Sequence, residues 1–128
     1  MRTEEEQRNL QHVIDMFNNV LVPLDSSQVD NYISPDYIQH SQMAPPGIQA
    51  LKEFLNARHL DSTQSQQLLK RAFVDGDHVM LHYHVIRFPD DPGFAVMDIF
   101  RLEDGMIVEH WDVVQDVPTD SPNPNSMF

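Results

Sequence analysis

Residues 96–115 constrain the fold more than any other segment, because they have the pattern of two β-strands joined by a tight turn. Apolar runs flank Glu103-Asp104-Gly105, and two such runs around a turn-forming sequence predict a β-hairpin. The hairpin carries Asp98 in its first strand, and His110 and Asp112 in its second, among large apolar neighbours. Burying a carboxylate without a partner is costly. The three side chains therefore indicate a polar pocket rather than a plain hydrophobic core.

The turn decides whether these groups meet, and the sequence allows two registers. A two-residue turn at Asp104-Gly105 puts Asp98 opposite Trp111 and the other two ionisable groups on the far face. A three-residue turn, with the glycine left-handed, puts Asp98 opposite His110 and all three groups on one surface. A slip of one residue reverses the faces of a whole strand. We favour the three-residue turn, because it lets the polar groups hydrogen-bond to one another.

Composition limits the classes of function. A chain of 128 residues is long enough for one domain with its own core. Its net charge of −12 argues against binding to nucleic acid or to an anionic membrane, both of which require clustered basic residues. It has no cysteine, which excludes disulfides, thiolate chemistry and cysteine-based zinc sites. Neither a signal peptide nor an apolar membrane span is visible, so we expect a soluble cytoplasmic protein.

The order of predicted elements indicates an α+β fold. Thr3 and Glu6 form a capping-box sequence at the start of a helix expected over 3–22. A short helix from Ser26, an extended segment over 36–41 and a helix over 47–59 follow. A polar connection over 61–67 then leads to four strands, expected at 68–74, 79–88, 94–102 and 107–117. We expect the helices to pack on one face of a curved antiparallel sheet, in a domain over 1–117 with a disordered tail over 118–128.

Four further side chains are candidates for the pocket. His40 lies in the segment after the second helix, where it could rim a pocket mouth or simply hydrogen-bond within a loop. His82 and His84 project to one face of a strand, a spacing found in metal sites when a third ligand completes the set. Two histidines alone are more often pocket-wall or sheet residues. We expect Tyr37, His82 and His84 to line the substrate pocket, with no metal bound.

A plainer interpretation of the hairpin also stays open. Asp98, His110 and Asp112 could lie on an exposed sheet face or in a dimer contact, since clustered ionisable groups mark functional sites only some of the time. No glycine-rich phosphate loop and no Gly-x-Ser-x-Gly sequence occurs. Nucleotide binding and serine hydrolase chemistry therefore have no support.

The chain resembles the SnoaL-like polyketide cyclases of the nuclear transport factor 2-like superfamily. The resemblance covers nearly everything before the tail and rests on Tyr37-Ile-Gln-His40, the helix after Pro46, His82-Tyr-His84, and above all the hairpin segments 98–105 and 107–115. It implies a cone, in which a bent antiparallel sheet wraps around a long N-terminal helix and leaves a pocket at the open end. This agrees with the element order and supports the three-residue turn.

The resemblance also implies a chemistry. Cyclases of this family close a ring by intramolecular aldol reaction, using an acid/base residue and no metal or cofactor. Asp98 and Asp112 lie on strands from which the superfamily supplies such groups, and His40 and His110 resemble pocket residues of SnoaL-like proteins. The catalytic residues would then be Asp112 or Asp98, which abstracts a proton next to the carbonyl, and His110 and His40, which hold or protonate the developing oxyanion. We therefore expect a cofactor-free acid/base enzyme, of aldol cyclase or isomerase type, acting on a small apolar carbonyl compound. The superfamily also contains binders without turnover, so a small-molecule-binding or dimerisation module is the alternative.

The predicted architecture also suggests that two copies of the chain associate. A sheet covered by helices on one face leaves the other face open, and an apolar surface of that size rarely stays bare. We expect a homodimer through the outer sheet face, with Trp111 contributing.

Overall fold

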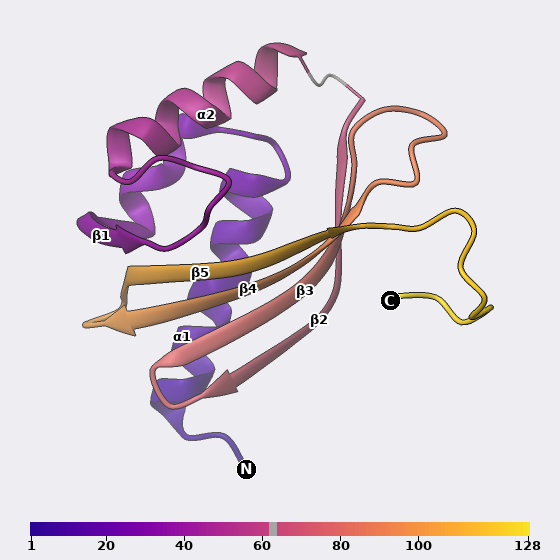
Figure 1. The fold of residues 1–128 in the computed structure, drawn as a ribbon. Coiled ribbons are helices and arrows are strands. Elements are labelled where there is room, and N and C mark those ends of the chain that lie inside the picture. Colours follow the sequence, from indigo (N-terminus) through magenta and orange to yellow (C-terminus); the bar gives the residue numbers. More distant parts are fainter. Residues whose placement is uncertain (62–63) are drawn as a thin grey trace.

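The computed structural model describes residues 1–61 and 64–128 and shows helices packed against a five-stranded sheet (Figure 1). The strands lie in the order β1-β5-β4-β3-β2. The elements are α1 (Glu4–Met16), η1 (Phe17–Leu21), η2 (Ser26–Asn31), β1 (Ile33–Gln39), α2 (Ile48–Asp61), β2 (Gln66–Asp75), β3 (His78–Ile86), β4 (Phe94–Glu103) and β5 (Met106–Asp116). The predicted α+β class is confirmed. The connection expected over 61–67 includes residues 62–63, which lie outside the described part.

The N-terminal helix begins where the sequence predicts. The Thr3 hydroxyl accepts a hydrogen bond from the Glu6 backbone N–H, and the Glu6 carboxylate accepts one from the Thr3 N–H, which completes the capping box. After Met16 the helix continues as one π-helical stretch, η1. The short helix expected from Ser26 is a 3₁₀-helix, η2, capped by the Asp25 carboxylate.

Strands β2 to β5 form the expected antiparallel meander. The sheet as a whole is mixed, however, because β1 pairs with β5 in parallel. The sequence indicated only a short extended segment over 36–41, and this segment becomes part of an edge strand. The parallel pairing aligns Gln39 with His110, which brings residues 71 positions apart in the sequence next to each other.

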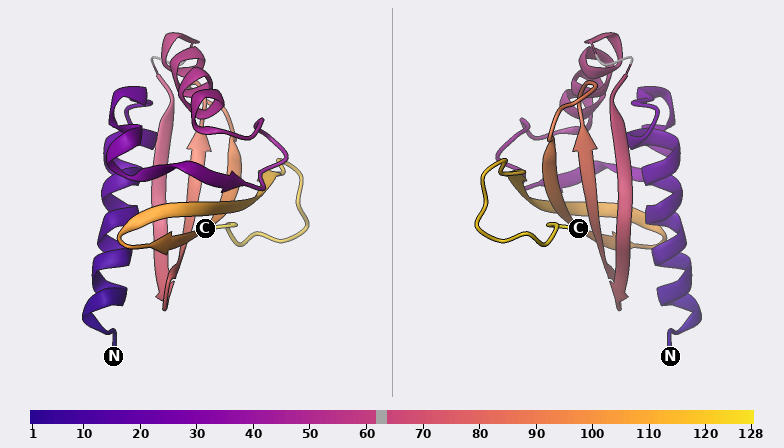
Figure 2. Two further views of the ribbon diagram at one scale, coloured as in Figure 1. Left: turned by 90° about the vertical axis from the view of Figure 1, so that its left-hand side faces the viewer. Right: turned by 90° about the vertical axis from the view of Figure 1, so that its right-hand side faces the viewer.

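The inner face of the sheet carries the core. Figure 2 shows α1 running lengthwise along this side of the sheet, with α2 across one end. Side chains of α1, η1 and every second sheet residue fill the space between them. The largest fully buried ones are Phe17, Met16, Leu55, Leu81, Ile107, Val13, Val20, Val29 and Val79. Asp98, His110 and Asp112 lie on this same inner face.

Residues 118–128, the expected disordered tail, contain no helix or strand in the structure. They turn back toward the outer face of the sheet (Figure 1), where the Phe128 ring stacks on His84 with centroids 4.3 Å apart. Elsewhere, within the two described ranges, none of the helices has the length and apolar character needed to cross a membrane.

Candidate functional site

The turn of the β4–β5 hairpin differs from the one predicted. Glu103 pairs with Met106, so the turn has two residues, Asp104 and Gly105, and both have positive φ, at 50° and 79°. This is the backbone of the tight hairpin turn that Asp-Gly favours. The prediction of a three-residue turn is therefore wrong.

A β-bulge nevertheless places the ionisable groups together. The pairing shifts between Arg101 and Leu102, because Leu102 faces Ile107 while Arg101 faces Glu109. One residue of β5 is skipped, and the skip reverses the face of everything beyond it. Asp98 thus lies opposite Asp112, neither opposite Trp111 nor opposite His110 as the two sequence-based registers require.

Asp98, His110 and Asp112 form one cluster on the inner face. The His110 Nε2 atom lies 2.7 Å from Asp98 Oδ1, and the His110 ring stacks on Phe100 with centroids 4.8 Å apart. One ligand-type atom of each of the three ionisable residues lies within 4.8 Å of the others. Asp98 is 2% exposed, so its carboxylate depends on these partners for the hydrogen bonds that water would otherwise provide.

Strand β1 and the residues after it complete the cluster. The Gln39 Oε1 atom lies 2.7 Å from His110 Nδ1, and the Gln39 amide nitrogen donates to the Tyr37 hydroxyl at 3.3 Å. The Ser41 hydroxyl donates to Asp112 Oδ2 at 2.9 Å. Both ring nitrogens of His110 and one oxygen of Asp112 are therefore held by specific partners.

Tyr83 adds a hydroxyl from β3. Burial raises the pKa of Tyr83 well above its ordinary value, and the charge of Asp98, a hydrogen bond to Asp98 and the charge of Asp112 raise it further. The phenol stays protonated at neutral pH as a result. Asp98 thus has two neighbours able to donate to it, His110 and Tyr83.

The pKa of His110 is also shifted. Burial opposes its charged form, but the hydrogen bond to Asp98 and the charges of Asp98 and Asp112 outweigh burial and raise the pKa above its usual value. The site therefore favours an imidazolium beside two carboxylates. It can hold one proton on the His110–Asp98 pair and leave a second carboxylate free to accept another.

His40 lies outside this cluster. Its ring stacks face to face on Trp111, with centroids 4.9 Å apart, and its Nε2 lies 2.7 Å from Glu109 Oε2. Trp111 pairs with Ile99 on the outer face of the sheet. Gln39 and Ser41 turn inward, so the residue between them turns outward. The structure thus does not bring His40 to the cluster, where we expected it at the mouth of a pocket and among the catalytic groups.

His82 and His84 also lie on the outer face. They alternate along β3 with Leu81 and Tyr83, which are buried, and alternation sends the histidines to the opposite side. His82 contacts the Arg71 guanidinium through its Nδ1 atom. The structure therefore does not bring either histidine to the wall of the cluster, whereas Tyr37 reaches it through Gln39.

Three residues of the cluster were not among the candidates: Gln39, Ser41 and Tyr83. Tyr83 had a usable signal, because it alternates with Val79 and Leu81 on an apolar strand face. Gln39 and Ser41 had none, since their positions depend on the parallel pairing of β1 with β5.

The spacing of Asp98, His110 and Asp112 is short enough to surround a cation. The hydrogen-bond pattern already uses the ring nitrogens, however, because Nε2 faces Asp98 and Nδ1 faces Gln39. A metal ion would have to displace the proton between the ring and the carboxylate. Acid/base chemistry makes use of the arrangement without that rearrangement.

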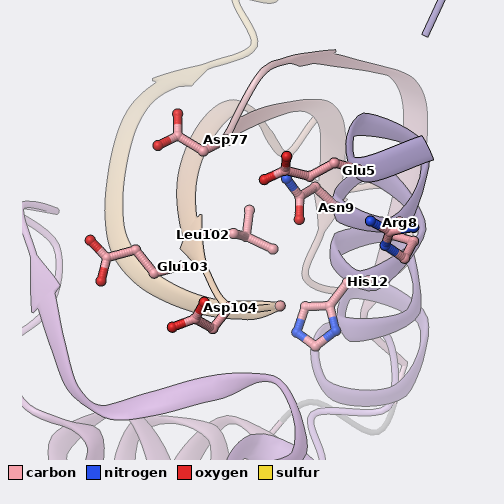
Figure 3. Close-up of a pocket in the computed structure, with 9 residues that line it drawn as sticks. Glu5, Arg8, Asn9, His12, Asp77, Leu102, Glu103 and Asp104 are labelled. Atoms are coloured by element: carbon pink, nitrogen blue, oxygen red, sulfur yellow. The ribbon is translucent and has the colours of Figure 1, made fainter. Parts of the chain in front are cut away.

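A separate groove lies at the turn end of the molecule, with a volume of about 830 Å³. Figure 3 shows Glu5, Arg8, Asn9 and His12 of α1 on one side of it and the two hairpin turns on the other. None of the cluster residues lines this groove. Its acidic side chains belong to a solvated surface, and it is not part of the site.

Solved structures with the same architecture come from several bacteria. A candidate polyketide cyclase from Bacillus cereus ATCC 10987 superposes with a TM-score of 0.74 at 18% identity, over 88% of this chain and 78% of that one. A SnoaL-like candidate polyketide cyclase from Jannaschia sp. CCS1 gives 0.72 at 18%, over 89% and 90%. A candidate ketosteroid isomerase from Kribbella flavida gives 0.75 at 11%, over 93% and 86%. At these identities the likeness concerns the fold.

The family follows from the sequence itself. A comparison with curated proteins gave no significant match. The sequence profile of the SnoaL-like domain, however, matches residues 12–110, which is more than half of the chain and includes most of the cluster. The chain therefore belongs to the family of SnoaL-like domains, as the resemblance of its hairpin indicated.

Proposed function

We propose that this protein is a cofactor-free acid/base enzyme that acts on a small, mainly apolar carbonyl compound, in a reaction of aldol cyclase or isomerase type. The observation that carries the proposal is the pair of facing carboxylates, Asp98 and Asp112, in unequal surroundings around one imidazole. Two carboxylates in unlike environments divide acid and base roles between them. Structural neighbours described as polyketide cyclases and a ketosteroid isomerase support this class of reaction.

Asp112 is the base in this proposal. Asp98 is buried and is engaged by His110 and Tyr83. Asp112 is partly exposed, and within the described residues its one side-chain hydrogen bond comes from Ser41. Asp112 therefore has lone pairs available for a proton on a carbon next to the substrate carbonyl.

The proton held by His110 and Asp98 supplies the acid. When Asp112 takes a proton from carbon, negative charge develops on the carbonyl oxygen, and a nearby positive group stabilises it. The raised pKa of His110 favours the charged form of that group. In an isomerisation, the proton returns to a different carbon. In an aldol closure, the enolate carbon attacks a second carbonyl, whose oxygen takes a proton from His110, and exchange with water then returns Asp112 and His110 to their starting protonation.

The test does not need the natural substrate. Aromatic and polycyclic ketones would first be screened for binding by thermal shift. For those that bind, exchange of the proton next to the carbonyl would be followed by NMR in D₂O. We expect the protein to accelerate exchange and Asp112→Asn to reduce the acceleration by ~100-fold or more, the scale of a lost general base.

The matched control is Asp116→Asn, an exposed carboxylate further along β5, which should leave the exchange rate unchanged. Ketones that bind tightly without any accelerated exchange would contradict the enzyme and favour a binding module. The cluster is poorly exposed, with Asp98 at 2% and Ser41 at 7%. This low exposure is the observation that favours the second function, binding without turnover.

A homodimer through the outer sheet face belongs to the same proposal. This face carries exposed apolar side chains from three strands, β2, β4 and β5: Leu68, Phe73, Met97, Ile99 and Val113. Apolar side chains gathered on one sheet face are typical of a protein–protein contact. Trp111 lies beside Ile99 on the same face.

A further inference from the structure

Gln39 has an orientation that the main chain determines. Its Oε1 atom lies 3.0 Å from the Ser41 backbone nitrogen and 2.7 Å from His110 Nδ1. A backbone N–H can only donate a hydrogen bond, so the side-chain atom facing it must be the amide oxygen. The usual uncertainty between the oxygen and nitrogen of a glutamine amide is removed here by this donor.

The protonation of the His110 ring follows from that orientation. Because Gln39 presents an oxygen, the Nδ1 atom of His110 must carry the proton of their hydrogen bond. The other ring nitrogen, Nε2, lies 2.7 Å from a carboxylate oxygen of Asp98. Two lone pairs at that distance repel each other, so a second proton lies between the ring and the carboxylate.

We propose that Gln39 is a positioning residue that fixes the Nδ1–H form of His110 and thereby keeps a second proton shared between His110 and Asp98 at neutral pH. Without an acceptor at Nδ1, a neutral ring could carry its one proton on Nε2 and still donate to Asp98. Gln39 makes that arrangement unfavourable, because an unprotonated Nδ1 would face an amide oxygen.

The surroundings hold Gln39 in place from several elements. The His40 backbone N–H donates to the His110 carbonyl at 2.9 Å, which ties the end of β1 to β5. The Gln39 amide nitrogen donates to the buried Tyr37 hydroxyl. Phe100 of β4 stacks on the imidazole and sets the plane of the ring.

The charges facing the ring act in the same direction. Asp98 of β4 and Asp112 of β5 are the carboxylates of the cluster, and the Tyr83 phenol of β3 donates to Asp98. Both carboxylates favour a protonated imidazole. The use of the shared proton as a catalytic acid rests on the proposed function, whereas its presence on the ring does not.

The experiment is NMR of protein labelled with ¹⁵N-histidine, in which the shifts of the two ring nitrogens report which of them carries a proton. The chain has seven histidines, and His110→Asn identifies the signals of His110. In the unaltered protein at pH 7 we expect both nitrogens of His110 to be protonated. In Gln39→Met, which keeps the length of the side chain but lacks the acceptor, we expect Nδ1 to lose its proton at a lower pH than in the unaltered protein, because the carboxylates still favour the charged ring but the acceptor at Nδ1 is gone.

Two further variants complete the design. Gln42→Met makes the same change at an exposed glutamine three positions along, whose amide donates to the His40 carbonyl, and it should leave the His110 signals unchanged. Gln39→Glu keeps an acceptor and should keep Nδ1 protonated, which provides a test if Gln39→Met does not fold. An unprotonated Nδ1 in the unaltered protein, or unchanged His110 signals in Gln39→Met, would overturn the inference.

The result of the histidine NMR experiment is independent of the result of the ketone exchange assay. Altered ring protonation in Gln39→Met, combined with no exchange activity in any variant, would leave the role of Gln39 standing and remove the proposed function. Exchange activity combined with unchanged His110 signals in Gln39→Met would support the proposed function and remove the role of Gln39.

Discussion

Asp98 lies directly opposite Asp112 on neighbouring antiparallel strands, and the two carboxylates differ in exposure. Directly opposed like charges destabilise a sheet unless something compensates them. His110 and Tyr83 provide that compensation on the Asp98 side, and Ser41 contributes one hydrogen bond on the Asp112 side. The two carboxylates therefore differ in how much the fold depends on them.

Stability should depend far more on Asp98 than on Asp112. Asp98→Leu leaves a partly buried imidazolium and a buried phenol without their acceptor, and removal of one partner of a buried pair costs about 3 kcal/mol or more. Asp112→Leu changes a partly exposed group and should cost about 1 kcal/mol or less. Urea unfolding of the two variants measures the difference. Equal losses would contradict the unequal surroundings of the two carboxylates.

The contribution of His110 to stability should decrease as pH rises. Its folded pKa is raised above the unfolded value of about 6.5, so the folded state binds the proton more tightly than the unfolded chain. The resulting stabilisation is fully present below about pH 6.5 and is lost as pH rises through the folded pKa. The free energy of unfolding of the unaltered protein, minus that of His110→Asn, should therefore be larger at pH 6 than at pH 8.5. A difference that grows with pH would refute this assignment.

The sequence predicted the type and order of the elements because these depend on local periodicity. Four strands and two main helices lie within a few residues of their expected positions. The hairpin register was not predictable in the same way. The Asp-Gly turn and the bulge near Arg101 each shift the pairing by one, and their combined effect returns Asp98 to the face of His110. A prediction from the type of turn alone therefore assigns Asp98 the wrong partner on β5.

The cluster itself was only partly predictable for a related reason. Its three ionisable members lie in one hairpin, where apolar neighbours make them conspicuous. Gln39 and Ser41 arrive through a parallel strand pairing that no local pattern encodes. The faces of β3 could have been assigned, since Val79, Leu81 and Tyr83 form a continuous apolar face that excludes His82 and His84 from the interior.

Metal should not be needed for folding or for ketone exchange. His110 Nε2 and Asp98 Oδ1 are already joined through a proton at 2.7 Å, and a cation would have to replace that proton. We expect elemental analysis, after purification without added metal, to show far less than one equivalent of zinc or iron. Chelator should leave the melting temperature unchanged. Stoichiometric metal lost together with activity would overturn the metal-free assignment.

Association through the outer sheet face can be tested at Val113, which is 71% exposed in the single chain and lies on that face opposite Met97. Sedimentation at micromolar concentration should show a dimer, and Val113→Lys should shift it to monomer, because burying an unpaired ammonium in an apolar contact is costly. Val22→Lys makes the same change at a residue 41% exposed at the end of the N-terminal helical segment, away from the sheet, and should leave the dimer intact. A monomer in the unaltered protein, or equal dissociation in both variants, would count against the sheet-face interface. The −12 charge of the chain makes lysine the better probe than glutamate, since an added negative charge would weaken any self-association regardless of its position.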